Sequence, residues 1–211
     1  IRSPSYHDGR ILISKLLLTI VLLVASSLLT AQEDVIEFTV DSGGVGTELI
    51  AVVPFSWQGS QPPIDVAEVI ANNMERSGLF SPIARSDLPA TPSEASDVIF
   101  RNWQLLGTPS LVIGAIETDA SGEFIVRFRL FDVNTARQAL GFEFQVPASK
   151  LRSIAHRISD LIFEHLTGVP GAFDTRIAYV IERILADGSS RYALNIADSD
   201  GFNSRNMLES S

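Results

Sequence analysis

The chain of 211 residues carries 16 Lys and Arg against 25 Asp and Glu, a formal net charge of −9 at pH 7. Hydrophobic residues make up 45% and charged residues 19%, a composition typical of one folded domain or two small ones. The negative charge argues against a nucleic-acid-binding protein and against binding to anionic lipid headgroups, because phosphates would be repelled.

Residues 1–31 have the parts of a secretory signal peptide. Three basic residues precede an apolar run at 16–25, and Ala31 is a small residue near the end of the segment. The run is shorter than the roughly 20 apolar residues of a membrane span, although an uncleaved single-span anchor is the alternative. We expect cleavage after Ala31, export to the periplasm and no stable membrane insertion afterwards. The chain has no cysteine, so its core alone must support the fold.

The first elements predicted after the leader are two strands and a helix. Residues 35–41 are rich in β-branched and aromatic types and predict a strand. Glycines at 43, 44 and 46 break it, and the apolar run at 49–55 favours a buried central strand. An amphipathic helix is predicted over 64–77, with Gly78 as its stop signal.

The middle of the chain predicts a β-meander. After a surface loop at 82–92 and a short helix around Trp103, alternating apolar residues mark strands at 110–117, 124–130 and 140–146. A long amphipathic helix is predicted over 150–167, with Ser149 as its N-cap and Gly168 as its end.

Two further strands are predicted at 175–181 and 191–198, whereas 203–211 shows no pattern. The predicted fold class is α/β (α+β). It is a two-layer sandwich over 45–170, with two main helices packed on one face of a mixed sheet.

Candidate chemical sites are few. His156, Asp160 and Glu164 are each four residues apart and share one helix face, an arrangement that could ligate a metal. Because this row lies opposite the apolar stripe and next to Arg157, we interpret it as a solvated, ion-paired face. His165 projects near the apolar stripe and is expected to be packed there.

Catalytic and phosphate-binding motifs give no better lead. The glycines at 43, 44 and 46 do not have the G-x-G-x-x-G spacing, and a strand follows them where a phosphate site needs a helix N-terminus. There is no cysteine nucleophile and no G-x-S-x-G elbow. The sequence therefore predicts no catalytic residue, no cofactor and no metal.

Several segments resemble the TolB family of the bacterial Tol–Pal envelope system. Residues 50–57 (IAVVPFSW) and 76–80 (RSGLF) are similar to its second strand and to the end of its first helix. The most specific resemblance is 166–180 (LTGVPGAFDTRIAYV), the family's passage from the N-terminal domain into its propeller, and 192–203 resembles the first propeller hairpin.

The resemblance implies a non-catalytic periplasmic scaffold that links inner-membrane TolA to the outer-membrane lipoprotein Pal, with roles in outer-membrane integrity, cell division and colicin import. It implies that the mature N-terminus binds the TolA C-terminal domain by strand addition, whereas the propeller binds Pal. By position, the protein-binding residues would be Gln32, Glu33, Asp34, Val35, Ile36, Glu37, Phe38, Thr39, Val40 and Asp41.

The resemblance also divides the chain. Residues 32–44 would be a mobile partner-binding strand and glycine joint, 45–170 the N-terminal domain, and 171–211 a linker with the first strands of a truncated β-propeller, which puts Pal binding in doubt. One alternative is a periplasmic accessory domain for outer-membrane lipoprotein assembly, since 50–55 resembles a strand of such domains. The other is a metal-dependent or ligand-binding periplasmic protein that uses the His156 row.

Overall fold

The computed structural model describes residues 46–210, which lie within one compact unit at Val45–Ser211. The predicted leader and the predicted strand at 35–41 lie outside the described residues. The strands are β1 (Glu48–Val52), β2 (Ser56–Gln58), β3 (Phe80–Pro82), β4 (Ser110–Thr118), β5 (Phe124–Asp132), β6 (Arg137–Val146), β7 (Arg176–Ile184), β8 (Ser190–Asp198) and β9 (Arg205–Glu209). The α-helices are α2 (Val66–Arg76), α3 (Phe100–Leu105) and α4 (Leu151–Thr167), with short 3-10 helices at Arg85–Asp87, Ala95–Asp97 and Ala148–Lys150.

The first sheet is mixed, as the sequence predicts. Its order is β3-β1-β4-β5-β6. β1 is parallel to both β3 and β4, whereas the β4–β5 and β5–β6 pairs are antiparallel. The strand predicted at 49–55 ends at Val52 as β1, and a separate short strand, β2, follows the predicted range; both pair with β4. Pro54 lies at the break, where a proline cannot donate a ladder hydrogen bond.

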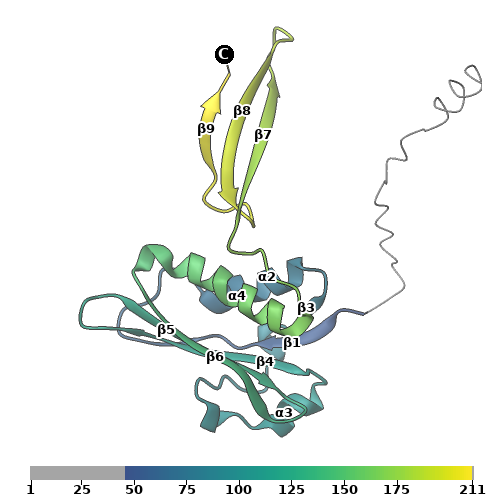
Figure 1. Cartoon of the computed structure of the whole chain (residues 1–211), viewed down its shortest axis with the longest axis vertical. Coiled ribbons are helices and arrows are strands. Elements are labelled where there is room, and N and C mark those ends of the chain that lie inside the picture. The colour runs from purple at the N-terminus through teal and green to yellow at the C-terminus, as the bar shows by residue number, and fades with distance from the viewer. Residues whose placement is uncertain (1–45, 211) are drawn as a thin grey trace, which may run out of the picture. The chain divides into compact units, whose positions relative to one another are not determined.

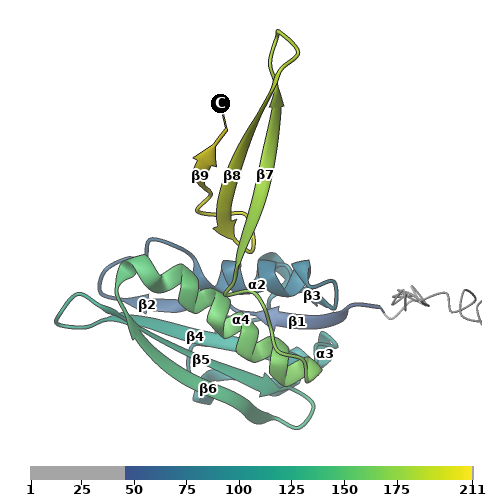
Figure 2. The ribbon, with the colours of Figure 1, turned by 45° about the horizontal axis from the view of Figure 1, so that its top comes forward.

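Both faces of this sheet are covered, by different elements (Figures 1 and 2). Helices α2 and α4 pack on one face over a core that includes Ile50, Val126 and Ile158. On the other face a smaller core forms around Trp103 of α3, which is 1% exposed. β5 serves both cores because successive side chains point to opposite faces of a strand.

The two long helices begin and end through different devices. Asp65 caps α2, since its side chain accepts a hydrogen bond from the Glu68 N–H at 3.0 Å. The prediction of Ser149 as the N-cap of α4 is wrong: Lys150 holds that position without a side-chain bond, because a 3-10 turn leads into the helix. Gly168 ends α4 in the left-handed conformation (φ 74°), as predicted.

The second sheet is antiparallel, in the order β7-β8-β9. The hairpin predicted from 175–181 and 191–198 is confirmed as β7 and β8. The sequence predicted no element at 203–211, and this is wrong, because β9 forms there and pairs with β8. The register shifts opposite Leu194 and Asn195 of β8, so that Met207 is an extra residue in β9 and breaks its two-residue alternation.

Within residues 46–210, no helix is both long enough and apolar enough to cross a bilayer.

Candidate functional site

The face of α4 that the sequence assigns to solvent is partly buried and forms hydrogen bonds and ion pairs with three other segments. His156 is 2% exposed and Asp160 is 7% exposed. One turn before His156, Arg152 lies on the same face. These three side chains contact α2, the segment after α4 and the turn between β8 and β9.

The contact of His156 with α2 fixes the position of its proton. Its Nδ1 lies 2.9 Å from Nδ2 of Asn73, a residue that is itself 1% exposed. Asn73 Oδ1 accepts from Arg76, which can only donate, so the amide nitrogen must face His156. The same nitrogen donates to Ser159 Oγ, whose own proton goes to the Ala155 carbonyl. Nδ1 is therefore an acceptor, and the neutral ring carries its proton on Nε2.

The opposite edge of the ring faces the turn between β8 and β9. Nε2 lies 3.6 Å from Oδ2 of Asp200 and has no hydrogen-bond partner within the described residues. Arg152 donates to the same Asp200 oxygen, and its Nε lies 3.9 Å from Asp198 Oδ2. The Arg152 guanidinium also lies 4.0 Å from the ring centroid of Phe202, a cation–π contact. Both ends of the turn are thus attached to α4.

Asp160 attaches the linker between the two sheets. Its Oδ1 accepts the Phe173 N–H at 2.7 Å and its Oδ2 accepts the Asp174 N–H at 3.3 Å. Ser153 of α4 adds a bond to the Asp174 carboxylate at 2.9 Å. The Phe173 ring packs edge-on against Phe163 of the same helix, with 5.6 Å between centroids.

Burial and charge act on the titratable groups of this junction in opposite senses. Burial lowers the pKa of His156 below its usual 6.5, and the nearby Asp200 charge only partly offsets this. Burial raises the pKa of Asp200, but the Phe202 N–H bond and the positive charge of Arg152 outweigh it and leave that pKa below 3.8. Around neutral pH the junction therefore holds a neutral imidazole beside a guanidinium–carboxylate pair.

The junction has the composition of a metal site but not its protonation. Ligand atoms of His156, Asp198 and Asp200 lie within 4.8 Å of one another. The Nε2 nitrogen that faces the carboxylates carries the proton, however, so it has no lone pair to offer a cation. Arg152 also supplies a positive charge to the same carboxylates. This geometry favours a structural junction.

The interpretation of this helix face as solvated is wrong for two of its three residues. His156 and Asp160 are buried, and the alternative of a metal row with Glu164 is not formed because Asp160 is bonded to the linker and Glu164 is exposed. The prediction of a packed His165 is also wrong, since it is exposed. Periodicity identified the apolar stripe of α4, but could not show that a later segment covers its polar face.

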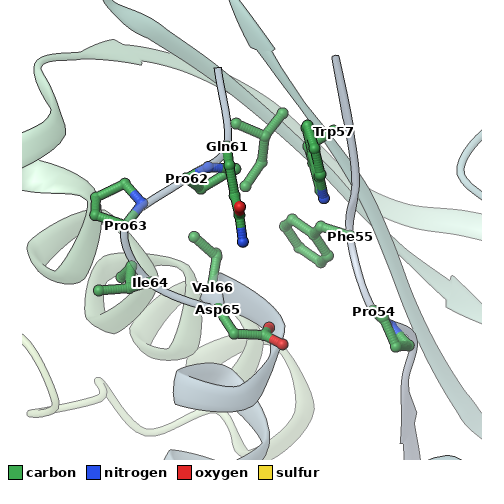
Figure 3. Close-up of a pocket in the computed structure, with 10 residues that line it drawn as sticks. Pro54, Phe55, Trp57, Gln61, Pro62, Pro63, Ile64, Asp65 and Val66 are labelled. Carbon is green, nitrogen blue, oxygen red and sulfur yellow. The ribbon is translucent and has the colours of Figure 1, made fainter. Parts of the chain in front are cut away.

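A groove lies beside β2, at the start of α2. Its cavity volume is about 360 Å³, and Pro54, Phe55 and Ile116 contribute to its lining. Figure 3 shows the Trp57 indole opposite the Gln61 side chain, with Phe55 below them. The Asp65 carboxylate at its edge caps α2 and pairs with Arg85 at 2.7 Å. The groove therefore combines the polar groups of Gln61 and Asp65 with apolar side chains, including an indole that is 52% exposed.

The protein-binding strand predicted at 32–41 lies outside the described residues, as do the glycines at 43 and 44. Gly46 is described, and a Cβ added to it would meet no atom within 4 Å. The described residues therefore do not pack closely around Gly46, the last glycine of the predicted joint.

The described residues define an α/β sandwich domain joined through one helix to an antiparallel sheet. Residues 36–139 match the family model of the TolB amino-terminal domain. The Tol-Pal system protein TolB of Nitrosococcus oceani is 45% identical over 170 residues, which cover 80% of this chain and 39% of that protein. The corresponding Pseudomonas syringae pv. syringae protein is 40% identical over 194 residues, covering 92% of this chain and 44% of that one.

A solved structure supports the same assignment. The crystal structure of TolB from Acinetobacter baumannii superposes with a TM-score of 0.67 at 33% identity, covering 78% of this chain and 39% of that chain. Through residues 36–139, the chain belongs to the TolB amino-terminal domain family, as the resemblance indicated. It spans about two fifths of the length of the relatives that it matches.

Proposed function

We propose that this chain is a non-catalytic periplasmic scaffold of the Tol–Pal envelope system, which links inner-membrane TolA to outer-membrane Pal. Its roles would then be outer-membrane integrity, cell division and the import of colicins. The observation that carries the proposal is the 45% identity to a Tol-Pal system protein, together with the TM-score of 0.67 to a TolB crystal structure.

The TolA contact in this proposal is made by residues 32–41. Their alternation of apolar and polar types suits a strand that adds to the sheet edge of a partner, where main-chain hydrogen bonds supply affinity and alternate side chains supply specificity. The glycines at 43, 44 and 46 would give this strand freedom to leave the domain. The family match begins at residue 36, within this segment.

The Pal contact in this proposal belongs to a β-propeller that begins with β7, β8 and β9. The sheet has large apolar side chains in contact with solvent on all three strands, among them Val180, Tyr192 and Leu208. A propeller blade buries such residues against its neighbours, and an exposed apolar surface of this kind is typical of an interface. Pal binding would need blades beyond the strands described.

A substitution pair tests whether the predicted strand binds by strand addition. We expect Phe38→Pro to abolish binding of residues 32–211 to the TolA C-terminal domain, because proline cannot donate to a ladder. Thr39→Ala, at the neighbouring position, should keep most of the affinity. Equal affinity of the Phe38→Pro variant and the unchanged chain, measured by calorimetry, would contradict strand addition.

A further inference from the structure

The two ring nitrogens of His156 face different elements: one is hydrogen-bonded to α2, and the other faces the turn between β8 and β9. Nδ1 accepts from Asn73 of α2 at 2.9 Å, whereas Nε2 faces Asp200 in the turn between β8 and β9 at 3.6 Å. Because the ring is buried, water cannot readily replace a hydrogen bond that it loses. Each of these contacts therefore depends on the protonation state of the imidazole.

We propose that His156 is a proton-operated coupling residue, which holds α2 through Asn73 when neutral and engages the Asp198–Phe202 turn when protonated. The proposal concerns the regulation of the junction between the two sheets and stands whichever partner the chain binds.

The neutral state is set by the amide of Asn73. Once Nδ1 gains a proton, it and Asn73 Nδ2 are two donors 2.9 Å apart, so this bond must break. Rotating the Asn73 amide by 180° would not restore the bonding. It would remove the oxygen that accepts from Arg76 and the nitrogen that donates to Ser159. Protonation therefore disturbs the packing of α2 against α4 at Asn73.

The protonated state favours the turn. An imidazolium at 3.6 Å from the Asp200 carboxylate gains an attraction that the neutral ring lacks. The other charges that act on the ring are Asp198 at the end of β8, Asp174 in the linker and Arg152 on α4. Arg152 repels the imidazolium, whereas the carboxylates attract it. On acidification, Asp200 therefore interacts with both the Arg152 guanidinium and the His156 imidazolium, and no longer with Arg152 alone.

The first test is an NMR titration of the full chain that follows the imidazole nitrogens and the backbone amide of Gly201, which donates to the Asp198 carbonyl within the turn. We expect the neutral His156 ring to carry its proton on Nε2 and its pKa to lie below the usual 6.5 of a histidine. The Gly201 amide should shift with the same midpoint as His156. Asp200, whose pKa is lowered, titrates in a separate and more acidic range.

The controls use the two histidines of α4. His156→Asn keeps an acceptor near the position of Nδ1 but cannot be protonated, so the Gly201 transition should disappear; His165→Asn should leave it unchanged. Persistence of the Gly201 transition in His156→Asn, or a neutral ring with its proton on Nδ1, would overturn the proposal.

A second variant keeps the test decisive if His156→Asn does not fold. Asn73→Ala removes the donor that stabilises the neutral ring, so the midpoint of His156 should rise in this variant. Asp200→Asn removes an attracting carboxylate, and the midpoint should fall. An unchanged midpoint in both variants would show that neither neighbour is coupled to the proton.

Discussion

Gly171 lies directly against Asp160, one of the buried carboxylates of α4. A Cβ built on the glycine would come within 2.6 Å of the Asp160 Cα and 2.5 Å of its Oδ1. The linker can reach α4, and its amides at 173 and 174 can bond to the Asp160 carboxylate, only because residue 171 has no side chain.

Gly171→Ala should therefore move the linker away from α4. Because the clash involves backbone as well as side-chain atoms, we expect a loss of about 1–3 kcal/mol in the free energy of unfolding. Gly46→Ala is the matched control, since its Cβ would meet no atom within 4 Å. Denaturant unfolding of both variants checks this, and equal stability of the two would contradict the described contact.

Arg152→Met should destabilise the junction of α4 with the turn between β8 and β9. The arginine bonds to Asp200 while both side chains are less than one fifth exposed, so its loss leaves a largely desolvated carboxylate without its main cation. We expect a cost of about 1–3 kcal/mol in the free energy of unfolding. Arg85→Gln breaks a pair whose side chains are 45% and 38% exposed and should cost about 1 kcal/mol or less.

Stability should depend on pH through His156 in a defined direction. Its pKa is lowered in the folded chain by burial, so below pH 6.5 the unfolded state binds more protons than the folded state. Stability is thus full above pH 6.5 and falls as the pH drops through the folded pKa. Chemical unfolding at several pH values, with His156→Asn as the control, checks this. The free energy of unfolding should fall less with decreasing pH in this variant, and an equal or steeper fall would contradict the prediction.

The two candidate caps of the long helices should differ in their effect on stability. Asp65→Ala removes a bond to the Glu68 amide and should cost about 0.5–2 kcal/mol in the free energy of unfolding. Ser149→Ala should change it by no more than about 0.5 kcal/mol, because this exposed residue makes no capping bond. Thermal unfolding distinguishes them, and a larger loss at Ser149 would restore it as the cap.

Local patterns were sufficient to predict most of the first domain. The alternation in 124–130 indicated the two-faced strand β5, and the spacing of apolar residues in 150–167 indicated α4. These signals are local because each element buries one face at the period of its own geometry. The early end of the strand predicted at 49–55, and the start of β2 after it, depend instead on how two short strands pair with β4.

The junction could not be predicted in the same way. His156 and Asp160 sit on the polar face of α4 by periodicity, and only the return of the chain at 171–174 and 198–202 covers them. The signal that was available is the resemblance of 166–180 to the family passage, which marks the segment after α4 as specific in sequence. Distant pairing of this kind depends on the tertiary fold, which no window of sequence contains.

The most direct test of the proposed function is a binding titration of residues 32–211 and 42–211 with the TolA C-terminal domain, alongside thermal unfolding of both chains. We predict that the longer chain binds, that the shorter chain does not, and that their unfolding midpoints agree closely. Undiminished binding by residues 42–211 would contradict the assignment of 32–41 as the partner strand. Absence of binding by both folded chains would contradict the TolA contact itself.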